Sequence, residues 1–126
     1  MIRSRALIED MLDDHDYAAD PQFRHASVLV PVDVAKLDAS WQRDDGLYIP
    51  PGGRQNVIGD RYIRAKMFIQ SGQQLESPMI GWNEWNGCVN FSNGRHRFAA
   101  LRDLGVKRVM VSVPIEQEKF FKDNFA

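Results

Sequence analysis

Five consecutive residues in the second half of the chain combine a tight-turn glycine with three basic side chains. The run that follows them, Phe98–Leu104, ends at Gly105 and predicts a helix that starts at about residue 95. The first amides of a helix have no acceptor within the helix, and the helix dipole adds partial positive charge there. Basic side chains in this first turn cost stability unless an anion is bound. The pattern therefore predicts a phosphate site formed by Asn93, Gly94, Arg95, His96 and Arg97.

The same basic residues have a second interpretation, which the sequence leaves open. Acidic residues concentrate between Glu9 and Asp20, whereas basic residues concentrate between Arg54 and Arg108. In this interpretation the basic side chains of the turn face solvent or pair with the acidic segment. The formal net charge of −1 argues against a protein that coats nucleic acid through bulk charge.

Two further groups lie in a stretch from Asp38 to Gly59 that lacks a helical or strand pattern. Arg54 follows Gly52-Gly53, where the backbone can approach a ligand closely, so Arg54 is either a second phosphate-binding residue or a solvated loop tip. Asp44-Asp45 either holds Mg²⁺ or forms a turn before the next glycine. Long irregular segments in compact domains are usually functional or disordered, and we expect this one to close over the ligand.

The elements that must position these groups indicate a single α/β domain over residues 1–126, with a small mixed sheet and packed helices. Helices are expected within residues 1–20, at 61–71 and from 95 to 104, and a C-terminal helix within 115–126 carries Phe121 and Phe125 on one face. Alternating valines predict strands at 27–32 and from 108, and Pro31 indicates either a sheet edge or the end of a strand in the first of them.

A hairpin is expected immediately before the basic turn. Asn86-Gly87 is a strong signal for a two-residue turn, here between strands at 79–85 and 88–92. A two-residue turn at this position would place Trp82 opposite Phe91. The single cysteine, Cys88, lies on the second strand and is expected to be a small buried residue.

The segment Asn93–Gly105 resembles the signature of the ParB/sulfiredoxin superfamily, in which a strand leads into a Gly-x-[His or Arg]-Arg turn and an alanine-rich helix ending in Leu-Gly. The architectural likeness covers residues 28–114. The resemblance implies a nucleotide ligand, ATP or CTP, whose phosphates contact Gly94, His96 and Arg97. Arg95 stands where sulfiredoxins carry their catalytic cysteine, so reduction of a sulfinic acid is not expected. Partition proteins usually carry a metal-binding glutamate at this position, and the chain departs from their Mg²⁺-dependent CTP chemistry in that respect.

These observations predict a small nucleotide-phosphate-binding domain, with ATP- or CTP-dependent phosphotransfer or nucleotide hydrolysis as its candidate activities and Mg²⁺ as a candidate cofactor. The alternative is a non-enzymatic module that uses the same basic turn to bind DNA or a protein partner. One cysteine excludes an internal disulfide framework, and no apolar run approaches the length needed to cross a bilayer. A cytoplasmic protein with no membrane partner is therefore expected.

Overall fold

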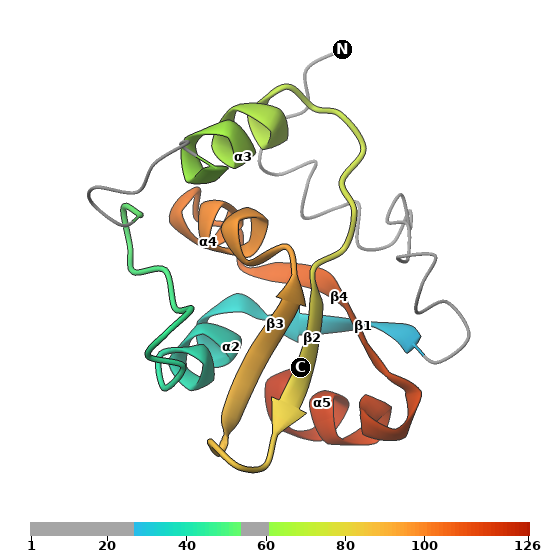
Figure 1. The fold of residues 1–126 in the computed structure, drawn as a ribbon. Coiled ribbons are helices and arrows are strands. Elements are labelled where there is room, and N and C mark those ends of the chain that lie inside the picture. The colour runs from blue at the N-terminus through green and yellow to red at the C-terminus, as the bar shows by residue number, and fades with distance from the viewer. Residues whose placement is uncertain (1–26, 54–60) are drawn as a thin grey trace.

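The computed structural model describes residues 27–53 and 61–126, which form a mixed α/β fold (Figure 1). Four strands make one mixed sheet in the order β1-β4-β2-β3: β1 (Ser27–Asp33), β2 (Met79–Asn83), β3 (Cys88–Asn93) and β4 (Arg108–Pro114). The described part of the chain also contains four α-helices and a short 3-10 helix: α2 (Val34–Trp41), α3 (Arg61–Gln70), α4 (Arg95–Asp103), η1 (Ile115–Gln117) and α5 (Glu118–Phe125). The expected mixed sheet with packed helices is confirmed.

The alternating valines pair across the sheet as their spacing predicts. Val30 faces Val111 across the antiparallel β1–β4 pair, and Val32 faces Val109, with all four side chains fully buried. Of the two positions that Pro31 indicated, the sheet edge is confirmed, because β1 is the outermost strand on its side. Strand β2 meets β4 in parallel, so the hairpin that precedes the basic turn is attached to the valine-rich half of the sheet.

Aromatic packing connects the hairpin to the helix of the basic turn. The Trp41 ring of α2 lies 4.6 Å from the ring of Phe91 on β3 and 5.8 Å from that of Phe98 on α4. These three aromatic residues belong to the buried core, which positions the end of β3 and the start of α4 relative to α2. At the C-terminus, Phe121 and Phe125 are both buried on α5, as predicted. Helix α3 packs on α4 (Figure 1).

The first part of the predicted irregular stretch is helical, so the prediction was wrong for residues 38–41. Helix α2 begins after Asp33, whose side chain accepts a hydrogen bond from the Lys36 amide and caps the helix. Its buried positions are Val34, Leu37, Asp38 and Trp41, which follow helical spacing. A carboxylate occupies one of these four positions and interrupts the apolar pattern in the sequence.

The hairpin register also differs from the prediction. Trp82 pairs with Val89, and Phe91 pairs with Ile80, so Trp82 and Phe91 are not opposite each other. The loop contains four residues because the Asn83 side chain accepts hydrogen bonds from the backbone amides of Trp85 and Asn86. This side-chain-to-backbone turn ends β2 at Asn83 and shifts the pairing by two residues.

Some predictions fall on residues that the structure does not describe. These are the helix within residues 1–20 and the phosphate-binding role of Arg54. Within residues 27–53 and 61–126, no helix has the length and apolar character required to cross a membrane.

Candidate functional site

The basic turn is built where β3 passes into α4. Gly94 adopts the left-handed conformation, with φ of 81°, and occupies the position before the first residue of the helix. A Cβ at this position would lie 2.9 Å from the Pro78 Cα and 3.0 Å from the Arg97 Nη1. Glycine therefore meets two demands, a positive φ and a close approach to the start of β2. Because Gly94 has no side chain, the N-cap residue itself does not cap this end of α4.

A hollow of about 280 Å³ opens beside the start of α4. Arg95 and His96 line it from the helix, and Arg61 lines it from the start of α3. Nothing in the sequence indicated Arg61 as a site residue, because it lies 32 positions before Asn93 along the chain. The described residues that line the hollow are Leu47, Arg61, Phe91, Ser92, Asn93, Gly94, Arg95 and His96.

The hollow is electropositive for two additive reasons. Among the described residues that line it are Arg61 and Arg95, and none of those described residues is Asp or Glu. The α4 dipole also directs its positive end at the same place, where the first helix amides have no intrahelical acceptor. Such a place stabilises an anion whose oxygens accept several hydrogen bonds, as phosphate oxygens do.

Arg97 occupies a different place from the other residues of the turn. Its Nη1 donates a hydrogen bond of 2.9 Å to the carbonyl oxygen of Glu76, in the segment between α3 and β2. Burial lowers the pKa of the Arg97 guanidinium, and the charge of Glu76 partly opposes this shift. Arg97 does not line the hollow. In this structure Arg97 connects the start of α4 to the segment between α3 and β2, which runs beside Gly94.

Arg95 connects the hollow to the irregular segment after α2. Its Nη1 donates a hydrogen bond of 3.1 Å to the carbonyl oxygen of Leu47, and Leu47 itself lines the hollow. The segment that was expected to close over the ligand therefore forms one wall of the site. Tyr48 and Ile49, which follow Leu47, pack against or within the hydrophobic core.

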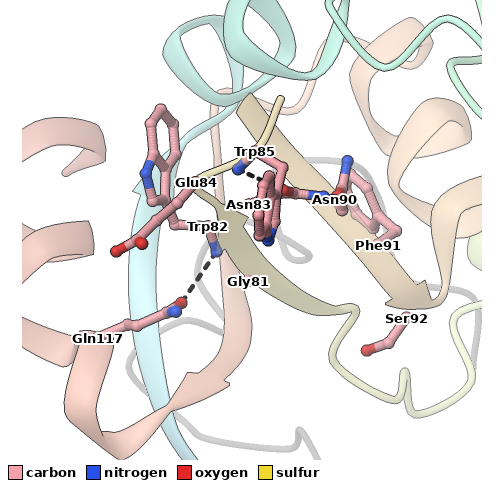
Figure 2. Close-up of a pocket in the computed structure, with 9 residues that line it drawn as sticks. All are labelled: Gly81, Trp82, Asn83, Glu84, Trp85, Asn90, Phe91, Ser92 and Gln117. Atoms are coloured by element: carbon pink, nitrogen blue, oxygen red, sulfur yellow. Dashed lines mark hydrogen bonds between the residues drawn. The ribbon is translucent and has the colours of Figure 1, made fainter. Parts of the chain in front are cut away.

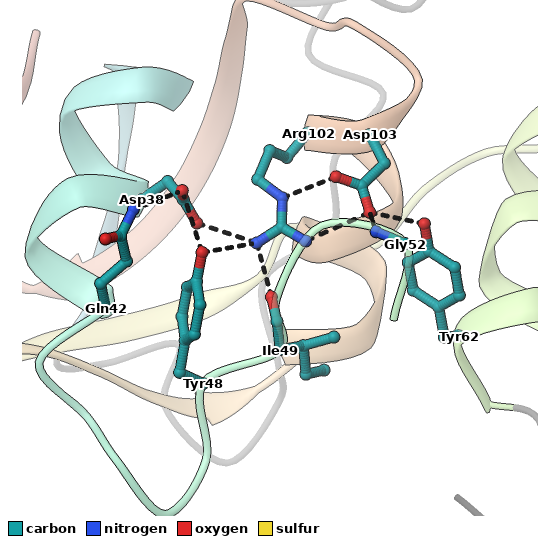
Figure 3. A network of polar contacts seen from close by, with 8 residues as sticks. All are labelled: Asp38, Gln42, Tyr48, Ile49, Gly52, Tyr62, Arg102 and Asp103. Atoms are coloured by element: carbon teal, nitrogen blue, oxygen red, sulfur yellow. Dashed lines mark hydrogen bonds and ion pairs between the residues drawn. The ribbon is translucent and has the colours of Figure 1, made fainter. Parts of the chain in front are cut away.

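A buried ion network fixes this wall (Figure 3). Arg102 of α4 donates to the Asp38 carboxylate at 2.9 Å, to the Ile49 carbonyl at 2.6 Å and to the Asp103 carboxylate at 2.8 Å. The Arg102 side chain is only 9 % exposed. Tyr48 also donates its hydroxyl to Asp38. One guanidinium thus joins α2, the irregular segment and α4.

The network continues to α3 through Asp103, which accepts hydrogen bonds from the Gly52 amide and the Tyr62 hydroxyl. Burial alone would raise the pKa of Asp103, but hydrogen bonds from Arg102, Tyr62 and Gly52 lower it overall. Burial and the hydrogen bond to Asp103 raise the pKa of Tyr62 to about 12. The backbone amide of Gly52 therefore binds a carboxylate of the protein itself.

The backbone of Gly53 lies close to the side chain of Tyr62 on α3. It has a φ of 83°, and a Cβ there would lie 2.8 Å from the Tyr62 ring. The close approach of Tyr62 explains the glycine at position 53, and the positive φ of 84° favours the glycine at position 52, while Arg54 lies outside the described residues.

Acidic residues do not gather into a metal site in the described part of the chain, where no group of three or more potential metal ligands is found. Asp44 is buried, and its carboxylate accepts a hydrogen bond of 3.0 Å from the Asn90 side chain. Among the described residues that line the hollow there is no carboxylate, the group that Mg²⁺ prefers as a protein ligand.

Cys88 is fully buried, as predicted, and lies on β3 away from the hollow. Burial and the nearby charge of Asp44 raise the pKa of its thiol, which disfavours the reactive thiolate. We expect Cys88→Ser to lower the free energy of unfolding by about 1 kcal/mol, because a hydroxyl replaces a buried thiol. Ligand binding should not change. Loss of binding at unchanged stability would contradict this assignment.

We compared the chain with protein-family models, with curated proteins and with solved structures, and none of them matches it.

Proposed function

We propose that this protein is a small nucleotide-phosphate-binding domain that holds the phosphates of ATP or CTP at the start of α4. The observation that carries the proposal is the hollow beside Gly94, whose described lining includes Arg61 and Arg95 and no acidic residue. Guanidinium groups bind phosphate oxygens through paired hydrogen bonds, and the first amides of a helix have no acceptor within the helix itself. His96 adds a further side chain that can donate to an anion.

The resemblance to the ParB/sulfiredoxin superfamily supports the same proposal. It depends on the segment Asn93–Gly105, and the order of elements in the fold is compatible with it. On this basis we propose a ParB/sulfiredoxin-like fold. The position of Arg97 against Glu76 gives the last residue of the Gly-x-[His or Arg]-Arg turn a role in fixing the helix start. Contacts to phosphate are then assigned first to Arg61, Arg95 and His96.

The activity proposed for this site is transfer or hydrolysis of a terminal phosphoryl group. Such reactions depend mainly on positioning and on neutralising charge that spreads over the phosphoryl oxygens. Arg95 is suited to this role because Leu47 and the helix together hold it at the edge of the hollow. Mg²⁺ bound to the nucleotide would supply further charge neutralisation.

The proposal predicts that Arg95→Ala weakens binding of Mg²⁺-ATP or Mg²⁺-CTP by about 10- to 100-fold. The expected size is that of one lost hydrogen bond to a charged group, about 1.5 to 3 kcal/mol. Calorimetric titration of the full chain with each nucleotide and with inorganic triphosphate measures the change directly.

Arg108→Ala is the matched control, because it removes the same charge from an exposed position on β4 that does not line the hollow. It should leave the affinity within about twofold, since exposed charges contribute little at long range in salt. The proposal is wrong if the wild-type chain binds none of the three compounds. Binding of a DNA duplex in their place would favour the non-enzymatic alternative.

A further inference from the structure

A second hollow lies on the β2–β3 hairpin, outside the site at the start of α4 (Figure 2). Its volume is about 550 Å³. Figure 2 shows Trp82, Glu84 and Gln117 gathered at one side of it, with Phe91 and Ser92 at the other. The described residues that line it are Gly81, Trp82, Asn83, Glu84, Trp85, Asn90, Phe91, Ser92 and Gln117.

The indole of Trp85 is the most unusual feature of this hollow. Trp85 is 98 % exposed, although exposure of such a large apolar ring to water is costly. Its backbone is held by the hydrogen bond from its amide to Asn83, so the ring is presented from an ordered turn. An exposed aromatic ring on an ordered turn is suited to stacking against a flat ligand.

The rest of the lining is ordered and polar. Gln117 accepts a hydrogen bond from the Trp82 amide through its Oε1, which leaves its Nε2 as a donor group at the hollow. The Trp82 ring packs on Phe120, with ring centroids 4.9 Å apart. Asn83 donates to Asn90, so the floor of the hollow is connected across both strands.

The charge of this hollow is opposite to that of the first. Among the nine described residues that line it, none is Lys or Arg, and Glu84 contributes a carboxylate. A polyphosphate would be repelled here. A ring that carries amino or hydroxyl donors would instead find an acceptor in Glu84, an amide donor in Gln117 and a stacking surface on Trp85.

The two hollows adjoin each other along β3. Phe91 and Ser92 line both of them. From Asn93 at the first hollow to Val89, which pairs with Trp82, the strand advances by four residues, or about 13 Å. This distance suits one extended ligand with an anionic end and a neutral aromatic end. The same distance is short for a nucleic acid strand. Each nucleotide of such a strand would also bring a phosphate close to the Glu84 carboxylate.

We propose that the hairpin hollow binds the nucleoside part of the nucleotide, with the base stacked on Trp85 and the phosphates in the hollow at the start of α4. This inference rests on the proposed function for the location of the phosphates. It assigns specificity for a base to the hairpin, where Glu84 and Gln117 would contact the donors and acceptors at the edge of the ring.

The test compares nucleotides with inorganic triphosphate, each with Mg²⁺, by calorimetry on the full chain. In the wild type, the preferred nucleotide should bind about 10-fold more tightly than inorganic triphosphate, because base stacking on an aromatic side chain has about this effect. Trp85→Ala should abolish the difference and leave the affinity for triphosphate unchanged. Trp85→Phe, which retains an aromatic ring, should preserve most of the difference.

Two outcomes would overturn the inference. One is equal affinity of Trp85→Ala and wild type for the nucleotide, and the other is an equal loss for nucleotide and triphosphate. Failure of the proposed function is a separate result, in which triphosphate does not bind at all. In that case quenching of tryptophan fluorescence by adenosine or cytidine that is present in wild type and lost in Trp85→Phe still supports a nucleoside site, and its absence in wild type rejects one. Because Trp85 is exposed, both variants are expected to fold.

Discussion

Replacing Gly94 with alanine should lower the free energy of unfolding by about 2–5 kcal/mol. The left-handed backbone at this position, with φ of 81°, costs an L-amino acid about 1–2 kcal/mol. The new Cβ would also lie 2.9 Å from the Pro78 Cα, and backbone movement to relieve such overpacking costs about 1–3 kcal/mol more. Chemical denaturation of the variant and the wild type measures the difference.

Gly52→Ala provides a control that separates these two costs. Gly52 has nearly the same backbone conformation, with φ of 84°, but no atom lies within 4 Å of the position of its Cβ. Its loss should be limited to the conformational cost of about 1–2 kcal/mol. If both variants lose the same free energy, the close approach of β2 to the start of α4 is not a constraint on residue 94.

The sequence was sufficient to predict those elements in which each residue's local preference agrees with its place in the fold. The valines of β1 and β4 alternate without interruption, and both strands form where they were expected. Helix α4 begins at Arg95, directly after Gly94, as predicted from the turn. These signals are local, so no knowledge of distant residues was needed to interpret them.

The predictions were wrong or incomplete where a side chain contacts a partner that is distant in the sequence or bonds to the backbone of a turn. Asp38 breaks the apolar stripe of α2 because its carboxylate pairs with Arg102, 64 residues later. The hairpin register depends on how Asn83 uses its side chain, which the Asn86-Gly87 signal does not contain. Arg61 enters the candidate site only because α3 packs on α4.

Residue type alone also could not predict which of the three basic residues of the turn would line the hollow. Arg95 and Arg97 are two positions apart on α4, so their side chains leave the helix in different directions. Arg95 reaches Leu47 and the hollow, whereas Arg97 reaches Glu76. A cationic turn in a sequence therefore indicates a region, while the packing of neighbouring segments decides which side chains can meet an anion.

Replacing Arg102 with methionine should have a comparable or larger effect on stability, about 3–5 kcal/mol. The guanidinium pairs with Asp38 and Asp103, whose side chains are 13 % and 12 % exposed, and it also binds the Ile49 carbonyl. Removing it leaves two largely buried carboxylates without their cation, a change that strongly destabilises proteins. Equilibrium unfolding of wild type and variant at neutral pH measures the loss.

The same pair of proteins should show a characteristic dependence on pH. Because the folded state lowers the pKa of Asp103, its contribution to stability is fully present above the ordinary aspartate range and is lost as pH falls through the lowered value. In Arg102→Met the hydrogen bonds from Arg102 that lower this pKa are absent. The stability gap between the two proteins should therefore narrow on acidification below about pH 4.

Lys122→Met tests whether burial, and not the loss of any ion pair, causes the effect. Lys122 bonds Glu118 at 2.7 Å, within the range of distances that Arg102 makes, but the two side chains are 52 % and 36 % exposed. Solvent screens such a pair, so its removal should cost no more than about 0.5 kcal/mol. A loss in Lys122→Met equal to that in Arg102→Met would mean that the buried network does not fix the wall of the site. A large loss confined to Arg102→Met would show that α2, the segment after it and α4 depend on one guanidinium for their arrangement around the hollow.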